Sequence, residues 1–328
     1  MKQETRPLPT QRPDDRKTTS SQPPPRFFEL IPSHTSIDFV AMAPRMVLLS
    51  VLFILVGMGS IYLRGLNYGI DFAGGTLVQV RFPQSTPVAD VRAALDLPGL
   101  GGVVVQDVGR EGRDFQIRVQ TADEATTSGT TEVVRAGLRE KFGEGAYDIL
   151  RVESVGPKVG RDLWRSATLA VLASTLMMGV YIALRFDLRF GVSVAAALLH
   201  NVLFALAAIS LAGMEFDLTT VAALLTIVGF SVNDNVVISD RIRENMRKTR
   251  RGDLRTILNV AINETLSRTV INSGTVIFVS TALLLLGGSA IHSFAFTLLV
   301  GFIIGTYSSI FVSTPIVLFL DRRGARRR

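Results

Sequence analysis

The sequence predicts a polytopic α-helical membrane protein with six transmembrane helices and one external α+β domain between the first and second helix. Of the 328 residues, 48% are hydrophobic, and the mean hydropathy is positive. Several apolar runs each reach about 20 residues, which is enough to cross a hydrocarbon core of roughly 30 Å. Between the first two runs, the pattern changes to short alternating segments that are typical of a soluble domain.

The N-terminal part, residues 1–44, is expected to be a cytoplasmic tail. Its first residues, to roughly position 26, are rich in Pro, Gln, Arg, Ser and Thr. This composition cannot bury a core and predicts disorder. The first transmembrane helix is expected at residues 45–63. Because this run is long and lies far from the start of the chain, it is interpreted as a retained helix and not as a cleaved signal peptide.

Residues 64–162 are expected to form the external domain. Alternation of apolar and polar residues predicts four strands, at Thr76–Phe82, Gly102–Val108, Phe115–Gln120 and Tyr147–Val155. Helical spacing predicts two helices, at Val88–Leu97 and Thr130–Phe142. The resulting order of strand, helix, strand, strand, helix, strand is that of a ferredoxin-like split βαβ domain, for which about 90 residues suffice.

Residues 163–320 are expected to contain transmembrane helices 2 to 6. The apolar runs that predict them are Leu163–Leu184, Val192–Ala212, Leu218–Ser239, Val270–Leu286 and Phe296–Leu320. A basic cytoplasmic tail, residues 321–328, follows the last of these runs.

The distribution of charge predicts the orientation in the membrane. Basic residues gather at Arg185 and Arg189, at 241–255 and in the tail, whereas the opposite connections carry Glu215 and Asp217. The positive-inside rule then places both termini in the cytoplasm and the α+β domain outside. The net charge of +7 is attributed to this topology and to contact with anionic lipid in the bilayer. Because no basic region is interleaved with aromatic residues, no nucleic-acid partner is expected.

Several kinds of function are excluded by composition and motifs. The sequence has no cysteine, so neither a disulfide nor a thiolate metal site is expected. His34, His200 and His292 lie far apart and form no recognisable metal-ligand motif. The glycine-rich stretch at residues 69–75 lacks the Lys-Ser/Thr ending of a nucleotide-binding loop, so ATP hydrolysis is not expected. The sequence therefore predicts neither a cofactor nor an enzymatic activity.

The strongest candidate for a functional residue is Asp234, which lies inside the fourth apolar run between Asn233 and Asn235. With a membrane boundary near Asp240, Asp234 lies about 9 Å below the surface. A carboxylate at that depth costs a few kcal/mol and is a functional candidate by default. In the alternative interpretation the helix ends earlier and Asp234 is a solvated terminal residue, although residues 236–238 continue the apolar pattern.

Other polar residues in the spans leave two interpretations open. Arg268 begins the fifth span at a depth comparable to that of Asp234, so it either faces Asp234 across helices or snorkels to the cytoplasmic surface. His200 and Asn201 in the third span either contact a polar interior or hydrogen-bond across helices. An intramembrane aspartyl protease would need a second deep Asp, and the sequence has none.

A ridge of small residues in the last span also has two interpretations. Gly301 and Gly305 are spaced four residues apart, and Ser309 and Ser313 continue the spacing. Such a ridge lets another helix approach closely. The helix that approaches belongs either to this chain or to a partner.

Three motifs resemble those of the SecD/SecF family, which belongs to the RND superfamily. The stretch after the first span is similar to the GxDFxGGT signature of the family, through Gly69, Asp71, Phe72, Gly74, Gly75 and Thr76. The stretch before the second span resembles the matching exit motif, through Gly156 and Pro157. Residues 230–235, 239–245 and 265–269 are similar to the SecF version in particular. The resemblance covers about residues 38–320.

The resemblance implies an accessory subunit of the bacterial Sec protein translocase in the inner membrane. It implies SecD as partner, the translocon subunits SecY, SecE and SecG, YajC as a further candidate, and the translocating preprotein. It also implies use of the proton motive force, with the proton as the only coupling ion. The resemblance also implies that Asp234 and Arg268, which match the family's proton-pathway positions, are the proton-pathway residues. Many relatives have His-Asp where this chain has His200-Asn201, which puts an acidic role at that position in doubt.

Two rival interpretations remain at this point. The first is half of another RND-type, proton-driven exporter with a different substrate, whose spans and external domain would look alike. The second is a passive membrane assembly subunit, in which Asp234 merely pairs helices. Only the motif residues argue against the first.

Overall fold

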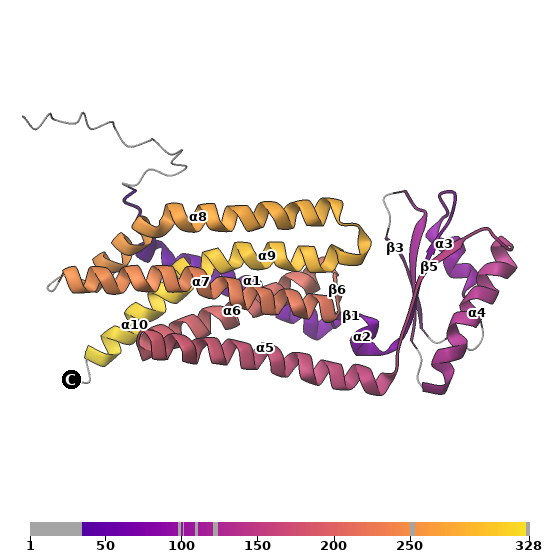
Figure 1. Ribbon diagram of the computed structural model, residues 1–328, viewed down its shortest axis with the longest axis horizontal. Coiled ribbons are helices and arrows are strands. Elements are labelled where there is room, and N and C mark those ends of the chain that lie inside the picture. Colours follow the sequence, from indigo (N-terminus) through magenta and orange to yellow (C-terminus); the bar gives the residue numbers. More distant parts are fainter. Residues whose placement is uncertain are drawn as a thin grey trace, which may run out of the picture.

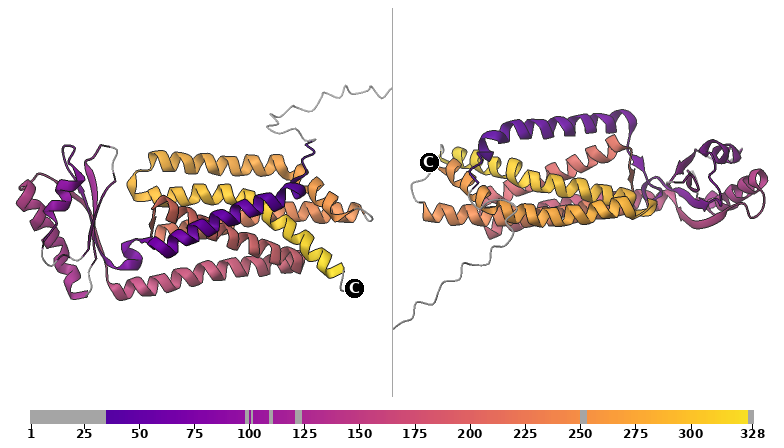
Figure 2. Two further views of the ribbon diagram at one scale, coloured as in Figure 1. Left: turned by 180° about the vertical axis from the view of Figure 1, so that it is seen from behind. Right: turned by 90° about the horizontal axis from the view of Figure 1, so that it is seen from above.

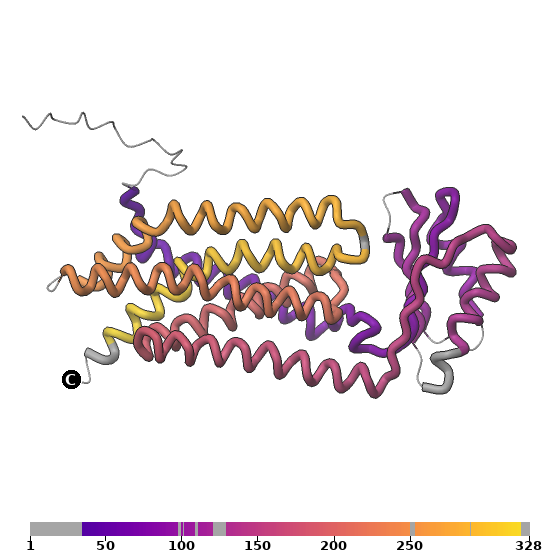
Figure 3. The backbone as a smooth tube through the Cα atoms, in the orientation of Figure 1, coloured from indigo at the N-terminus to yellow at the C-terminus, as the bar shows by residue number. Residues whose placement is uncertain are grey.

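A computed structural model describes residues 35–97, 100, 102–108, 111–120, 124–249 and 253–325. The expected N-terminal tail up to residue 34, and the last three residues of the basic tail, lie outside the described residues. Figure 1 and Figure 3 show an elongated helical bundle with an α+β domain at one end. The start of the first helix and the last helix lie at the opposite end of the bundle (Figure 2). These are called the domain end and the termini end below.

Six segments of the described chain are long and apolar enough to cross a membrane, as predicted. They are α1 (Phe39–Arg64), α5 (Pro157–Arg185), α6 (Leu188–Ala212), α7 (Leu218–Lys248), α8 (Leu254–Leu286), and α9 (His292–Ser308), which continues through a π-helical turn (Ser309–Ser313) into α10 (Thr314–Ala325). A π-helical turn inside a helix often marks a functional region. The six-helix membrane fold is therefore confirmed.

Five of the six helices begin earlier than the apolar runs predict, and α1 and α8 show why. Helix α1 begins at Phe39, because the Asp38 carboxylate accepts a hydrogen bond from the backbone N–H of Ala41 and caps the helix. Helix α8 begins at Leu254 and not at Val270. Its first turns are polar and contact α7. Hydropathy detects only the part of a helix that is apolar, so such polar extensions are missed.

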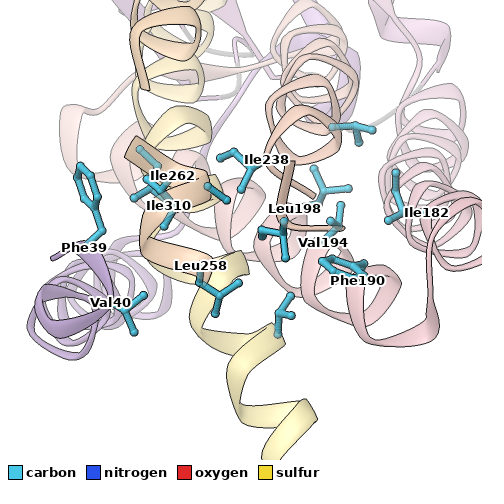
Figure 4. Packing of buried hydrophobic residues seen from close by; sticks show 14 of the residues in the cluster. Phe39, Val40, Ile182, Phe190, Val194, Leu198, Ile238, Leu258, Ile262 and Ile310 are labelled. Atoms are coloured by element: carbon cyan, nitrogen blue, oxygen red, sulfur yellow. The ribbon is translucent and has the colours of Figure 1, made fainter. Parts of the chain in front are cut away.

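Helices α6, α7 and α9 form the inside of the bundle, and α1, α5 and α8 lie on its outside. About 60% of the residues in the apolar windows of α6 and of α9–α10 are buried, against 11% in α1 and 17% in α5 and α8. Side chains from several helices meet in one cluster, which includes Phe39, Ile182, Leu198, Ile238 and Leu258 (Figure 4). The inner helices are therefore where polar side chains are shielded from lipid.

The α+β domain has the predicted order of elements. These are β2 (Gly75–Arg81), α3 (Val88–Ala94), β3 (Val103–Asp107), β4 (Asp114–Val119), α4 (Glu124–Phe142) and β5 (Asp148–Val155). The sheet is antiparallel with strand order β3-β4-β2-β5, which is the ferredoxin-like order. Helices α3 and α4 cover one face, where Val78, Phe115 and Leu138 are fully buried. The other face points toward the bundle.

Short elements join the domain to the bundle. They are β1 (Asn67–Tyr68), α2 (Ile70–Ala73) and β6 (Glu215–Phe216). Strand β6 lies in the connection between α6 and α7, and it pairs in parallel with β1, so that Asn67 lies opposite Glu215. Strands of two residues are too short to produce a sequence pattern. This pairing was therefore not predicted.

Candidate functional site

The side chain of Asp234 lies inside the bundle, with 2% of its surface exposed. Among the carboxylates of the described chain it is the only buried one. It lies on α7, and the helix continues well past it to Lys248. The alternative of a solvated residue at a helix end is therefore wrong, and Asp234 is a carboxylate enclosed by neighbouring helices.

Neutral groups surround this carboxylate. The hydroxyl of Ser273 on α8 donates a hydrogen bond to Asp234 Oδ2 at 3.2 Å, and the Thr306 hydroxyl on α9 donates to Ser273 Oγ at 2.6 Å. The side chain of Asn272 also interacts with the carboxylate. Three helices thus meet at one acidic group. Helix α7 contributes the carboxylate itself, and α8 and α9 each contribute a polar side chain without a charge.

Arg268 does not form an ion pair with Asp234 in the part of the chain that the structure describes. Its side chain is exposed and acts on the carboxylate only through longer-range electrostatics. It lines a cleft of about 560 Å³ that also contains Asp240, Arg241 and Glu264, toward the termini end. Val237, one turn from Asp234, forms part of the same lining. The structure therefore places Arg268 at the mouth of a polar cleft near the carboxylate, not against it.

His200 and Asn201 hydrogen-bond across helices, as one of the two interpretations expects. His200 Nε2 lies 3.0 Å from Ser50 Oγ on α1, and Asn201 Nδ2 donates to Ser231 Oγ on α7 at 3.2 Å. Ser231 lies one helical turn from Asp234 on the same helix. A second buried polar group thus adjoins the Asp234 site on its side toward the domain end.

The two asparagines beside Asp234 differ in environment. Asn233 is exposed, whereas Asn235 is buried and donates from Nδ2 to the backbone oxygen of Ser231 at 2.8 Å. Asn235 Oδ1 has no hydrogen-bond partner among the described residues. Asn233 therefore provides a natural comparison with Asp234, since it is adjacent in sequence and faces out of the bundle.

The ridge of small residues packs within this chain. A Cβ atom placed on Gly301 would lie 2.0 Å from Ile227 Cδ1, and one on Gly305 would lie 2.5 Å from Ser231 Oγ. Both contacts are with α7. The absence of side chains at these positions lets α9 approach α7 closely, and this approach brings Thr306 to the Asp234 site.

The glycine motif after α1 forms a joint between the domain and the bundle. Gly74 and Gly75 have φ angles of +75° and +124°, which favour glycine. A Cβ atom on Gly75 would lie 2.4 Å from the backbone oxygen of Val119. One on Gly74 would lie 3.0 Å from Pro157 Cα, at the start of α5. The motif thus packs the first strand of the sheet against β4 and α5.

The remaining motif residues strengthen the same joint. The Asp71 carboxylate accepts a hydrogen bond from the backbone N–H of Leu218 at 3.0 Å, at the start of α7. Phe72 lies 5.5 Å from Phe216, between ring centroids, in a stacked arrangement. Four further residues have local roles: Gly69 donates its N–H to Phe216 O, Thr76 hydrogen-bonds to Ser154, Gly156 is the N-cap of α5, and Pro157 is its first residue. The motif residues thus contact the start of α7, which lies far along that helix from Asp234.

Ser273 and Thr306 were not found by sequence analysis. Hydroxyl residues are common in membrane helices, where most hydrogen-bond to the backbone of their own helix. Thr275 and Ser280 on α8 do this. The position of Ser273 beside Asp234 depends on how α7 and α8 pack, which no local pattern encodes.

Comparisons with known proteins agree with the motifs. A family model described as "Protein export membrane protein SecD/SecF, C-terminal" matches residues 136–323, and one described as "SecD/SecF GG Motif" matches residues 59–85. The protein translocase subunit SecF of Magnetococcus marinus is 45% identical over 296 residues, which cover 90% of this chain and 94% of the relative. That of Rickettsia prowazekii is 40% identical over 294 residues, which cover 89% and 94%.

Two solved structures are also similar. One is the crystal structure of SecDF, a translocon-associated membrane protein from Thermus thermophilus, with a TM-score of 0.79 and 35% identity over 89% of this chain. The other is SecDF in a super-membrane-facing form, with a TM-score of 0.65 and 36% identity over 89% of this chain. In each case the match covers 40% of the SecDF chain. The chain thus spans about two fifths of that longer protein.

Proposed function

The chain belongs to the SecD/SecF family of protein export membrane proteins, and from that premise we propose that it acts with SecD as an accessory subunit of the bacterial Sec translocase. In this proposal it uses the proton motive force to promote the movement of preproteins across the inner membrane. The proton is the only coupling species and the chain catalyses no covalent reaction.

The observation that carries the proposal is the solitary carboxylate of Asp234 inside a bundle of this family. An ionised carboxylate in the observed surroundings has no charge partner within ion-pair distance among the described residues, so the arrangement suits the protonated acid. A group that must give up its proton before it can carry charge is suited to respond to a proton gradient. Each proton that crosses 100 mV supplies about 2.3 kcal/mol.

Arg268 has the complementary role in this proposal. Its guanidinium lies in the cleft at the termini end, within electrostatic reach of the carboxylate. When Asp234 loses its proton toward that side, its charge attracts the guanidinium of Arg268. The protonated and the ionised state of Asp234 therefore differ in how α7 packs against α8. Proton exchange is thereby converted into movement of helices.

The proposed setting follows from the same premise. The chain lies in the inner membrane with both termini in the cytoplasm and the α+β domain outside. It contacts SecD, SecY, SecE and SecG, with YajC as a further candidate, and the preprotein. The basic termini end and the acidic connection at the domain end, which includes Glu215 and Asp217, support this orientation.

The experiment that tests the proposed function is translocation of a purified preprotein into inverted membrane vesicles that lack or contain the chain. The chain should raise translocation when a proton gradient is present, and this gain should disappear when an uncoupler is added. An exporter of other substrates predicts no gain under either condition. A passive assembly subunit predicts a gain that the uncoupler does not remove.

A further inference from the structure

Arg118 on β4 links the sheet of the external domain to the connection between α6 and α7. Its Nη2 lies 2.8 Å from Glu215 Oε2 on β6. Its Nη1 donates to Asn67 Oδ1 at 3.1 Å and to the backbone oxygen of Tyr68 at 3.0 Å. One guanidinium thus holds both strands of the short β1–β6 pair. We call this set of contacts the Arg118 clasp.

The clasp is buried, unlike the other ion pairs of the domain. The exposed fractions of the Arg118 and Glu215 side chains are 6% and 17%. Arg118 is the only Arg or Lys among the buried residues of the described chain, and its Nε has no hydrogen-bond partner there. Burial raises the pKa of Glu215, while the guanidinium opposes this shift. Removal of one member of a buried pair leaves an uncompensated charge and is costly.

The clasp adjoins the helix that carries Asp234. Glu215 lies three residues before Leu218, where α7 begins. The side chain of Asp217 caps this helix by accepting the N–H of Thr220 at 2.7 Å. At 1.5 Å per residue, the start of α7 lies about 24 Å along the helix from Asp234. A continuous helix therefore connects the clasp to the carboxylate.

We propose that Arg118 is a positioning residue that fixes the orientation of the external domain relative to the domain end of α7, so that movement of α7 is transmitted to the domain. The link between the clasp and the proton gradient rests on the proposed function. The role of the clasp in orienting the domain does not depend on it. The polypeptide chain connects the domain to the bundle at two places, through β1 and through α5 (Figure 2). The clasp attaches it to a third element, β6, which immediately precedes α7.

The matched comparison is the ion pair between Arg81 and Asp114. It joins neighbouring strands of the same sheet with hydrogen bonds of 2.6 and 2.9 Å, but both partners belong to the external domain. Arg81→Met removes an ion pair of the sheet without changing any contact with the bundle. Arg118→Met removes one that crosses to the bundle.

The test is a spin-label distance measurement on the full chain, which lacks native cysteine. Labels at Glu140→Cys on α4 and Ala290→Cys between α8 and α9 report the position of the domain relative to the bundle; both sites are exposed. The parent should give one narrow distance distribution. Arg118→Met should shift or broaden it, and Arg81→Met should leave it unchanged. An unchanged distribution in Arg118→Met overturns the clasp.

Glu215→Gln tests the same contact from the side of the bundle and leaves the sheet intact, which keeps the test informative if Arg118→Met does not fold. It should broaden the distribution as well, and identical distributions in the parent and in Glu215→Gln also overturn the clasp. In vesicles, either variant should lose part of the gradient-dependent translocation that Arg81→Met retains. If the parent shows no gradient dependence, the proposed function fails, and the distance measurement alone decides the clasp.

Discussion

Within the described part of the chain, the Asp234 carboxylate has hydrogen-bond partners but no ion-pair partner, so the loss of a single hydrogen bond at this site should be measurable. Ser273 connects it to Thr306 on a third helix. We predict that Ser273→Ala lowers gradient-dependent translocation about fivefold, because one hydrogen bond to the carboxylate is worth about 1 kcal/mol. Translocation into vesicles at matched protein levels measures this.

Ser280→Ala is the control for that prediction. Ser280 is also buried on α8, but its hydroxyl bonds to backbone oxygens of its own helix, Val276 and Ile277. Translocation with this variant should equal that of the parent. Equal losses in the two serine variants would mean that α8 is merely sensitive to small changes, and would contradict a specific role for Ser273.

The ion pair between Arg81 and Asp114 should make the stability of the external domain depend on pH. Hydrogen bonds from Arg81 lower the pKa of this carboxyl group below its usual range. The pair therefore stabilises the folded domain above the unfolded pKa of about 3.9, and the stabilisation disappears as the pH falls through the lowered folded value. Since the Arg81 side chain is half exposed, solvent screens the pair and the stabilisation is small.

Chemical denaturation of residues 66–160, expressed alone, provides the measurement. The free energy of unfolding should be higher in the wild-type domain than in Asp114→Asn at pH 7, and the difference should shrink as the pH falls from about 3.9 through the lowered pKa of Asp114. A difference that does not change with pH would contradict the assignment. A fragment without cooperative unfolding would contradict the independence of the domain.

At the scale of elements, two glycines of α1 make a matched pair. A Cβ atom on Gly57 would lie 2.2 Å from Ala207 Cβ and 2.5 Å from its Cα on α6, whereas one on Gly59 would meet nothing within 4 Å. We predict that Gly57→Leu forces α1 away from α6 and destabilises the bundle by about 1–3 kcal/mol. Gly59→Leu should be tolerated. Thermal unfolding in detergent distinguishes the two, and equal melting temperatures would contradict the packing.

Elements were predictable where a local pattern repeats. Apolar runs of membrane length identified all six helices, and alternation identified the four strands of the domain to within a residue or two. The polar start of α8 was missed because its polar side chains are held by contacts with other segments: Glu264 by Arg241 and Asn245 on α7, and Arg255 and Asn259 by Asp38 before α1. Strands β1 and β6 were missed because a strand of two residues is too short to show alternation of apolar and polar residues.

The site was predictable only in part, because most of its contacts depend on how the helices pack and not on a local sequence pattern. Asp234 was identified because a carboxylate within an apolar run is costly in any packing. Its hydrogen-bond partner Ser273 was not identified. Arg268 and Ser273 lie five positions apart on α8, and only the rotation of that helix about its axis decides which of the two side chains faces Asp234. Arg118 and Glu215 lie far apart in sequence, on β4 and on the two-residue strand β6. Their contact follows from how the domain sits on the bundle.

At the scale of the whole molecule, orientation is directly testable because the chain has no cysteine. Ala290→Cys lies at the domain end and Thr249→Cys at the termini end, both exposed. The proposed orientation predicts that an impermeant maleimide added to intact cells or spheroplasts labels the first and spares the second. The opposite pattern would place the α+β domain in the cytoplasm.

The central claim is that the proton carried by Asp234 links the gradient to translocation, and one comparison tests it most directly. Preprotein translocation into vesicles is measured with and without a proton gradient for the wild type, Asp234→Asn and the exposed neighbour variant Asn233→Ala, at matched protein levels. Asp234→Asn should assemble, because Asn keeps the shape and accepts the Ser273 hydrogen bond. It should lose the gradient-dependent part of translocation and keep the rest, while Asn233→Ala keeps both. Wild-type gradient dependence in Asp234→Asn would contradict the claim and leave this carboxylate a structural role only.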